Sequence, residues 1–212
     1  MRLTKLGHAC VRLEQDGTTL VVDPGAFSDP GALAGADAVL ITHEHPDHFV
    51  EDKIRAAVQA EPQLRVFANR SVGGKLDGLG DRLRVVGEGD TFSVNGVEIA
   101  VYGELHAVIH PDIPRLTNIG YLVDGQLFHP GDALTVPDRP ISTLMLPAHA
   151  PWSKTAELID YVREVQPGRV VPVHDAGLSD IGRGMVQNLV GGGGPKTDVS
   201  YQPVPDGETV EV

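Results

Sequence analysis

The sequence has 212 residues, a hydrophobic fraction of 41%, a charged fraction of 22% and a formal net charge of −12. This length allows a large buried core, and the acidity, without any Lys/Arg cluster, argues against a nucleic-acid partner. The single cysteine, Cys10, excludes an intrachain disulfide, and no apolar run approaches the roughly 18 residues of a membrane helix. We therefore expect a cytoplasmic protein without a membrane partner, in a single domain over residues 1–212, and a homo-oligomer remains compatible with the sequence.

The first half of the chain predicts short strands separated by Gly-rich turns. Alternating or apolar runs place strands at 3–13, 18–22, 38–41, 65–68, 82–86, 90–94 and 97–102. Asn95-Gly96 between the last two is a strong hairpin signal. A helix is predicted over 47–60, with Pro46 suited to its first turn.

The second half mixes strands and helices. A Pro-containing loop over 106–118 is followed by a hairpin around Asp124-Gly125, by helices at 153–165 and 178–190, by a strand at 169–173 and by one or two strands in the tail. Ser153 is a plausible cap for the first of these helices. Gly191 to Gly194 is expected to be a flexible loop. The class is α/β with layered sheets.

The segment THEHPDH, residues 42–48, holds three histidines and an aspartate directly after an apolar run. His43 and His45 lie two apart at a strand end and can point the same way, whereas Asp47 and His48 follow in the next turn. Imidazole nitrogen and carboxylate oxygen are the donors that zinc takes. Two adjacent ions, about 3.5–4 Å apart as in two-metal hydrolases, would use all four side chains.

Three later residues are candidates for the remaining ligands, because each lies just beyond a predicted strand. They are His106, Asp132 in FHPGDA, and His174 after VVPV. Ligands that converge from several strand ends are how a rigid sheet positions a site. His110 could replace His106, and we favour His106 because it lies next to its strand.

These motifs together resemble the metallo-β-lactamase superfamily of metallohydrolases, in which HxHxDH is followed by a strand-end His, a Gly-Asp and a final strand-end His. The resemblance spans nearly the whole chain, as far as His174. GHACVRLE, VVDPG, FHPGDA and VVPVH look like the branch that contains L-ascorbate-6-phosphate lactonase-like proteins. The resemblance implies a four-layer αββα sandwich with the site at one edge, between the two sheets.

The resemblance also implies a ligand set. His43, His45 and His106 would bind a first ion, Asp47, His48 and His174 a second, and Asp132 would bridge them. Zinc is the usual metal of the family, although some members take iron or manganese, and the donor set alone suits several divalent ions.

Three residues are the candidate catalytic residues: Asp47, Asp132, which would orient the nucleophile, and His8, which would act near the metals as an orienting or proton-transfer residue. His129 and His149 are expected to lie near the pocket or at the surface rather than to bind metal.

The first functional hypothesis is a dinuclear metallohydrolase in which a bridging hydroxide attacks an ester, lactone or phosphoester of a small metabolite. The alternative is an iron-dependent oxidoreductase, although His45 argues against the diiron flavoprotein type, which has an acidic residue there. A nuclease is disfavoured by the acidity, and a non-catalytic metal-binding protein by the presence of all seven ligand positions. The loops 25–37, 103–118 and 146–153 would form the substrate pocket.

Overall fold

The computed structural model describes residues 1–195 and 197–212, and within them the chain forms two mixed β-sheets. The first sheet has the order β14–β1–β2–β3–β4–β5–β6, with β1 Arg2–Lys5, β2 Val11–Gln15, β3 Thr18–Val22, β4 Ala38–Ile41, β5 Arg65–Ala68, β6 Leu83–Val85 and β14 Thr209–Glu211. The second has the order β13–β12–β11–β10–β9–β8–β7, with β7 Thr91–Val94, β8 Val97–Tyr102, β9 Gly120–Val123, β10 Leu127–His129, β11 Thr143–Pro147, β12 Arg169–Val173 and β13 Ser200–Tyr201.

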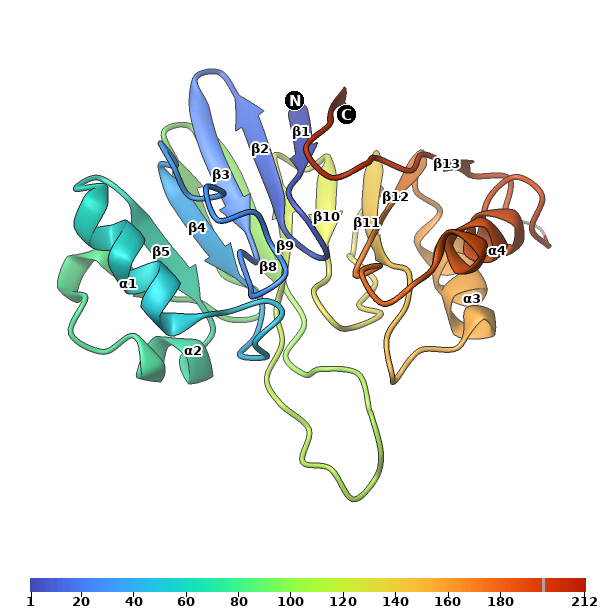
Figure 1. Cartoon of the computed structure of the whole chain (residues 1–212), viewed down its shortest axis with the longest axis horizontal. Coiled ribbons are helices and arrows are strands. Elements are labelled where there is room, and N and C mark those ends of the chain that lie inside the picture. Colours follow the sequence, from blue (N-terminus) through green and yellow to red (C-terminus); the bar gives the residue numbers. More distant parts are fainter. Residues whose placement is uncertain (196) are drawn as a thin grey trace.

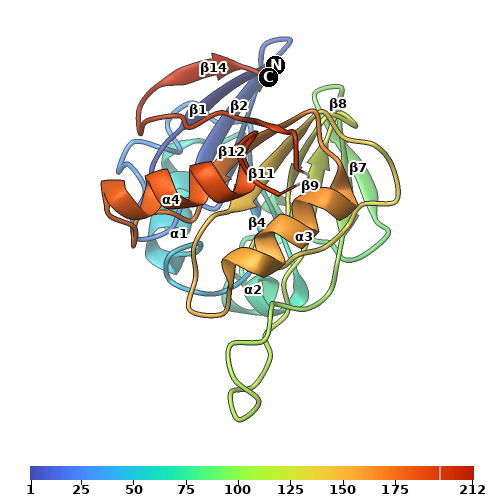
Figure 2. The same cartoon turned by 90° about the vertical axis from the view of Figure 1, so that its right-hand side faces the viewer.

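The helices cover the outer faces of the two sheets. In Figure 1, α1 Glu51–Ala60 and α2 Arg70–Lys75 lie on the side of the first sheet, and α3 Thr155–Val165 and α4 Asp180–Val190 lie on the side of the second. Figure 2 shows α3 and α4 crossing in front of the second sheet. A short 3₁₀ turn, Gly80–Arg82, precedes β6. This arrangement confirms the four-layer αββα sandwich. In the described residues, no helix is both long and apolar enough to cross a membrane.

The core has three apolar layers because each sheet is covered on both faces. The central layer between the sheets includes Leu40, Phe67 and Val171, and two outer layers lie under the helix pairs. Strands β3, β4, β9 and β11 are buried at every residue, as expected for strands covered on both sides. The hydroxyl of Tyr121 donates across the interface to the carbonyls of Ile41 at 3.0 Å and Phe67 at 3.1 Å, which ties the two sheets together.

The predicted strand over 3–13 is wrong in its middle. Strand β1 ends at Lys5 and β2 begins at Val11, and the turn between them has Gly7 at φ 100° and His8 at φ 51°. Because the apolar alternation continues across this turn, the periodicity did not reveal it. His8 therefore lies in a tight turn rather than on a strand.

Several predicted helix starts were too early. Helix α1 begins at Glu51, and 46–48 form a separate turn in which the His48 amide donates to the His45 carbonyl at 3.0 Å. Ser153 does not cap α3: Lys154 is the N-cap, and its amide donates to the Glu157 carboxylate at 3.2 Å.

Other local predictions had mixed outcomes. The Asn95-Gly96 and Asp124-Gly125 hairpins are confirmed by the antiparallel pairs β7–β8 and β9–β10. Strand β11 and helix α2 were missed. The continuous apolar run of β11 suits a parallel strand buried between β10 and β12, but it has no alternation from which to recognise it.

Candidate metal centre

The predicted site residues lie at one edge of the sandwich, where strands of both sheets end. The segment 42–48 follows β4, Asp132 follows β10, and His174 follows β12. His106 lies in the loop after β8, and His8 in the turn after β1. Because β10, β11 and β12 run parallel, their carboxyl ends meet at the same edge. The fold thus gathers residues that are up to 166 positions apart, from His8 to His174.

The first cluster comprises His43, His45, His106 and Asp132, whose donor atoms all lie within 4.8 Å of one another. His43 Nε2 faces His45 Nδ1 at 3.1 Å, and His106 Nε2 lies 3.4 Å from Asp132 Oδ2. Burial, reinforced by neighbouring imidazoles, lowers the pKa of both His43 and His45. Two neutral imidazoles therefore direct ring nitrogens toward the same point, which favours a cation between them.

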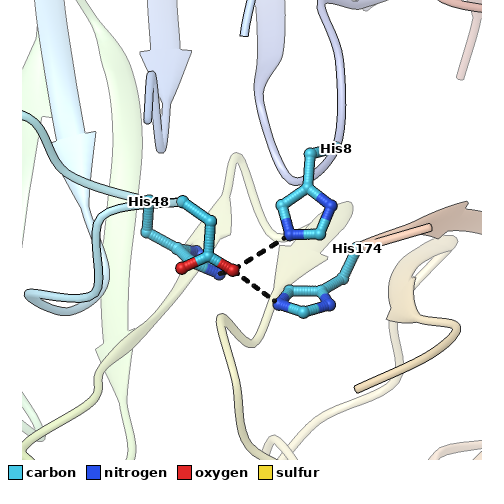
Figure 3. Close-up of side chains that lie close together, drawn as sticks. His8, His48 and His174 are labelled. Atoms are coloured by element: carbon cyan, nitrogen blue, oxygen red, sulfur yellow. Dashed lines mark hydrogen bonds and ion pairs between the residues drawn. The ribbon is translucent and has the colours of Figure 1, made fainter. Parts of the chain in front are cut away.

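The second cluster comprises His8, Asp47, His48 and His174. The shared Asp47 Oδ2 atom lies 3.2 Å from His174 Nε2 and 3.9 Å from His48 Nε2. Figure 3 shows the rings of His8 and His174 turned toward one carboxylate oxygen, with His48 beside them. This cluster includes the three residues expected at the second ion alone, and His8 in addition.

Asp132 belongs to the first cluster and also contacts the second. Its Oδ1 atom is 3.2 Å from His48 Nε2, and its Oδ2 atom is 3.2 Å from His174 Nε2 and 3.4 Å from His106 Nε2. It therefore contacts imidazoles of both sets, which is the position that a bridging ligand requires.

Four donor atoms of these clusters are buried without any hydrogen-bond partner among the described residues: His48 Nε2, His106 Nε2, His174 Nε2 and Asp132 Oδ1. The contacts at 3.2–3.4 Å bring them within ion-pair range but not into hydrogen-bond geometry. Buried polar atoms without partners are rare in native proteins and call for an explanation. Divalent ions bound at the two clusters would satisfy all four, so the residues present fit a metal centre.

The opposite ring nitrogens of the same histidines are satisfied. His48 Nδ1 lies 2.7 Å from Asp23 Oδ2, His106 Nδ1 donates to the Ala107 carbonyl at 2.6 Å, and His174 Nδ1 donates to the His149 carbonyl at 2.6 Å. Each of these bonds fixes the hydrogen on Nδ1 and leaves the Nε2 lone pair free for a metal. The pattern is that of metal-binding histidines and their orienting partners.

Without a bound ion, the carboxylates stabilise the charged form of nearby imidazoles, and the imidazoles stabilise the ionised carboxylates. Burial opposes charge on His48 and His174, yet nearby carboxylates prevail: Asp132 and Asp23 raise the pKa of His48 well above 6.5, and Asp132 and Asp47 raise the pKa of His174 to about 9. Burial opposes ionisation of Asp47 and Asp132, yet the pKa values of both carboxyl groups are lowered, because the close imidazoles at 3.1–3.4 Å outweigh burial. Metal binding would therefore release protons.

His8 lies directly against the second cluster. Its Nδ1 accepts the Ala176 amide at 3.3 Å, so the ring hydrogen is on Nε2, which lies 3.1 Å from Asp47 Oδ2. Its ring centroid is 4.0 Å from that of His174, and burial lowers the pKa of His8. In this tautomer, His8 donates to Asp47 and does not offer a lone pair to a metal.

Sequence reasoning missed three residues that hold the ligands in place. Asp23 is fully buried and accepts hydrogen bonds from the Thr42 amide, the Thr42 hydroxyl and His48. Trp152 Nε1 donates to Asp132 Oδ2 at 3.0 Å, and Asn118 Oδ1 accepts the Asp132 amide at 2.9 Å. Asp23-Pro24 looked like a turn, and the available signal was that Asp23 directly follows the buried strand β3.

The other three histidines lie outside the clusters. His110 is exposed in the 103–118 loop beside Asp112, so the structure brings His106 to the site and leaves His110 away from it. His129 is buried, with Nε2 at 3.0 Å from the Ala9 carbonyl. His149 is exposed, and its carbonyl accepts a hydrogen bond from His174 Nδ1.

Comparison with known proteins agrees with this geometry. The family model described as beta-lactamase superfamily domain matches residues 2–174, a range that contains all seven predicted ligands. The chain therefore belongs to the metallo-β-lactamase superfamily. Within it, the resemblance to the lactonase-like branch stays a prediction.

Two relatives illustrate this membership. The chain is 39% identical over 191 residues to Protein Rv0786c of Mycobacterium tuberculosis, covering 87% of this chain and 89% of the relative. It is 28% identical over 144 residues to a protein of Methanopyrus kandleri named UPF0173 metal-dependent hydrolase MK1542, covering 62% of each chain.

Two solved structures share the fold. One is Igni18, a metallo hydrolase from Ignicoccus hospitalis, with a TM-score of 0.76 and 20% identity, covering 99% of this chain and 97% of that one. The other is CmlA, a diiron β-hydroxylase from Streptomyces venezuelae, with a TM-score of 0.70 and 18% identity, covering 100% of this chain and 54% of that one. At this identity, they bear on the fold alone.

Proposed function

We propose that this protein is a dinuclear metallohydrolase that uses two divalent ions, zinc in the first instance, to hydrolyse an ester, lactone or phosphoester of a small molecule. The observation that carries the proposal is the set of four buried donor atoms without partners, three of them on histidines whose other nitrogen is already fixed. The family membership and the relative named as a metal-dependent hydrolase support the reaction class.

In this proposal, His43, His45 and His106 hold one ion, Asp47, His48 and His174 hold the other, and Asp132 contacts both sets. The bound ions would lower the pKa of a water molecule and polarise the bond to be cleaved. Trp152 and Asn118 fix the carboxylate and the backbone of Asp132, so that its two oxygens keep their separate directions.

His8 has two tasks in the proposed mechanism. Its Nε2 hydrogen keeps Asp47 oriented toward His174. Because burial lowers its pKa, His8 is neutral near pH 7, and its Nδ1 would accept a proton during the reaction by giving up the bond from the Ala176 amide. An orienting role alone predicts that His8→Gln retains much of the metal affinity, whereas proton transfer predicts a large loss of kcat with the metal still bound.

Two cavities beside the donor residues support a small substrate. One of about 250 Å³ includes His45 and His106 in its lining, and a neighbouring one of about 350 Å³ includes Trp152. The larger volume lies at the lower end of the range of small-molecule sites, roughly 300–1,000 Å³, and the smaller lies just below it. The 103–118 loop and Trp152 contribute to them, as expected for pocket loops, while Phe27 of the 25–37 loop lies against His8 with ring centroids 5.4 Å apart.

The test combines metal analysis with a substrate panel. Purified protein should bind two zinc or manganese ions per chain, and His48→Ala and His106→Ala should each bind fewer, while His110→Ala serves as the exposed control. The loaded protein should hydrolyse at least one class among simple esters, lactones and phosphoesters. Fewer than two ions per chain, with no hydrolysis after loading, would exclude the proposal; iron with oxygen consumption would instead support an oxidoreductase.

A further inference from the structure

The loop between β8 and β9, residues 103–119, forms a ribbon that projects from the edge of the sandwich where the donor residues lie (Figure 1). Its two sides pair through a bridge between Leu105 and Thr117, and the His106 amide donates to the Leu116 carbonyl at 2.9 Å. The Asn118 amide closes the base by donating to the Glu104 carbonyl at 3.0 Å. One side of the ribbon therefore carries a predicted ligand, and the other side is fixed in register with it.

Arg115 stands on the side opposite His106. Its Nε donates to the His106 carbonyl, which anchors the guanidinium to the backbone of a predicted ligand. Within the described part of the chain, no carboxylate lies within ion-pair distance of Arg115, and its two terminal nitrogens make no hydrogen bond. A guanidinium offers a planar fork of donors that matches carboxylate and phosphate oxygens.

Arg115 also lines both cavities beside the metal donors. The cavity of about 250 Å³ places it with His45 and His106, and that of about 350 Å³ places it with Trp152. The single carboxylate in either lining is Glu157, which already accepts the Lys154 amide and lies 3.5 Å from the Lys154 ammonium.

The rest of the ribbon's contribution to these cavities is apolar. Val108, Ile109 and Ile113 line the smaller cavity and are exposed at 53%, 37% and 49%. Exposed aliphatic residues beside a catalytic edge are suited to contact an apolar portion of a ligand. The ribbon thus places the Arg115 guanidinium, which has no carboxylate partner among the described residues, and an aliphatic surface next to the proposed metal ligands His45 and His106.

We propose that Arg115 binds an anionic group of the substrate, and that the substrate is an ester carrying a carboxylate or phosphate next to an apolar portion. This inference rests on the proposed hydrolase function. An anion on the guanidinium would be held beside His45 and His106, because Arg115 is tethered to the latter, while the apolar portion would lie along the ribbon.

The test uses two esters that differ in one group. 4-Nitrophenyl hydrogen glutarate and 4-nitrophenyl valerate have the same leaving group and the same number of acyl carbons, and one ends in a carboxylate where the other ends in a methyl. The zinc-loaded wild type, Arg115→Met, Arg115→Lys and the control Arg2→Met are compared. Arg2 is an exposed arginine at the start of β1, at the end of that strand opposite the turn that carries His8. It pairs with Glu14 at 3.4 Å.

The expected result is selective. Arg115→Met should lower kcat/KM for the glutarate ester by roughly 10- to 100-fold, mainly through KM, because a charge-assisted hydrogen bond is lost. It should change kcat/KM for the valerate ester less than about 3-fold, and Arg115→Lys should restore part of the glutarate activity. Equal losses on both esters would overturn the inference and leave Arg115 as a residue that holds the ribbon.

Equilibrium binding separates this inference from the proposed function. Titration calorimetry of the zinc-loaded proteins with glutaramate and valeramide, in which an amide replaces the ester, requires no turnover; the first ends in a carboxylate and the second, which is neutral, in a methyl. Wild type should bind glutaramate more tightly than valeramide, and Arg115→Met should remove that preference while Arg2→Met keeps it. Equal affinity of wild type for the two amides would overturn the inference even if the esters are hydrolysed. A preference that depends on Arg115 would support it even if neither ester is cleaved.

Discussion

Asp23 offers the most direct test of how the site is held together. The carboxylate is fully buried and accepts three hydrogen bonds: from the Thr42 amide at 2.8 Å, the Thr42 hydroxyl at 2.7 Å and His48 Nδ1 at 2.7 Å. Asp23→Asn keeps the shape but replaces one oxygen by an NH₂ group. In either orientation, a buried amide donor then faces another donor, and the negative charge beside His48 is lost.

The magnitude follows from these contacts. A buried donor left without an acceptor costs about 1–3 kcal/mol in the free energy of unfolding. If the NH₂ group faces His48, the ring must move its hydrogen to Nε2, the atom expected to bind metal. If the NH₂ group faces the Thr42 amide, the segment that carries His43 and His48 shifts. Loss of such a partner typically lowers metal affinity by roughly 10–100-fold, or about 1.4–2.8 kcal/mol.

The assay measures zinc affinity by competition with a chromophoric chelator, and stability by urea unfolding. Asp37→Asn is the matched control, because Asp37 also accepts a backbone amide, from Thr19 at 2.8 Å, but lies away from the donor clusters, and an asparagine oxygen can keep that bond. Zinc affinity of a folded Asp23→Asn protein within about 2-fold of wild type would refute the assigned role of Asp23.

Three further predictions test the geometry of the centre. His106→Ala should bind fewer metal ions per chain, measured by elemental analysis, whereas His110→Ala should match wild type; equal losses would contradict the placement of His106. Gly25→Ala should lower the free energy of unfolding by about 1–3 kcal/mol and reduce metal loading, because its Cβ would lie 2.0 Å from the Asp47 carbonyl oxygen, whereas Gly74→Ala, with open space, should do neither. In metal-free protein, the pKa of His174 is raised to about 9, above the ordinary 6.5, so its stabilising contribution is complete below pH 6.5 and is lost as the pH rises through 9. Urea unfolding with a chelator present should therefore show a decline in stability over that range that is smaller in His174→Asn, and an unchanged decline would count against the carboxylate contacts of His174.

The sequence was most informative where chemistry is concentrated in a short segment. Residues 42–48 place four metal donors close together, and no packing requirement explains such a density. His106, Asp132 and His174 were recognisable because each follows a strand, and strand ends converge on one edge. The turns at Asn95-Gly96 and Asp124-Gly125 were equally clear, because these pairs adopt the positive φ values that tight hairpins need.

The sequence was least informative where a residue acts through its surroundings. Asp23 resembles any turn aspartate until the fold places Thr42 and His48 against it. His8 sits in an alternating run, and only the left-handed turn at Gly7 and His8 directs it toward Asp47. Helix propensity likewise did not locate the start of α1 at Glu51, because the preceding turn is stabilised by bonds to the His45 carbonyl.

The sequence alone therefore indicated the family and the αββα class and predicted the donor residues, because these depend on residue type and on order along the chain. The tertiary structure decided which donors share a cluster, placing Asp132 in contact with both sets and His106 rather than His110 among them. It also oriented the imidazoles through Asp23 and the backbone carbonyls of Ala107 and His149. Distances of about 3 Å between residues far apart in sequence arise only when both sheets have packed together, and the chemistry of the site depends on those distances.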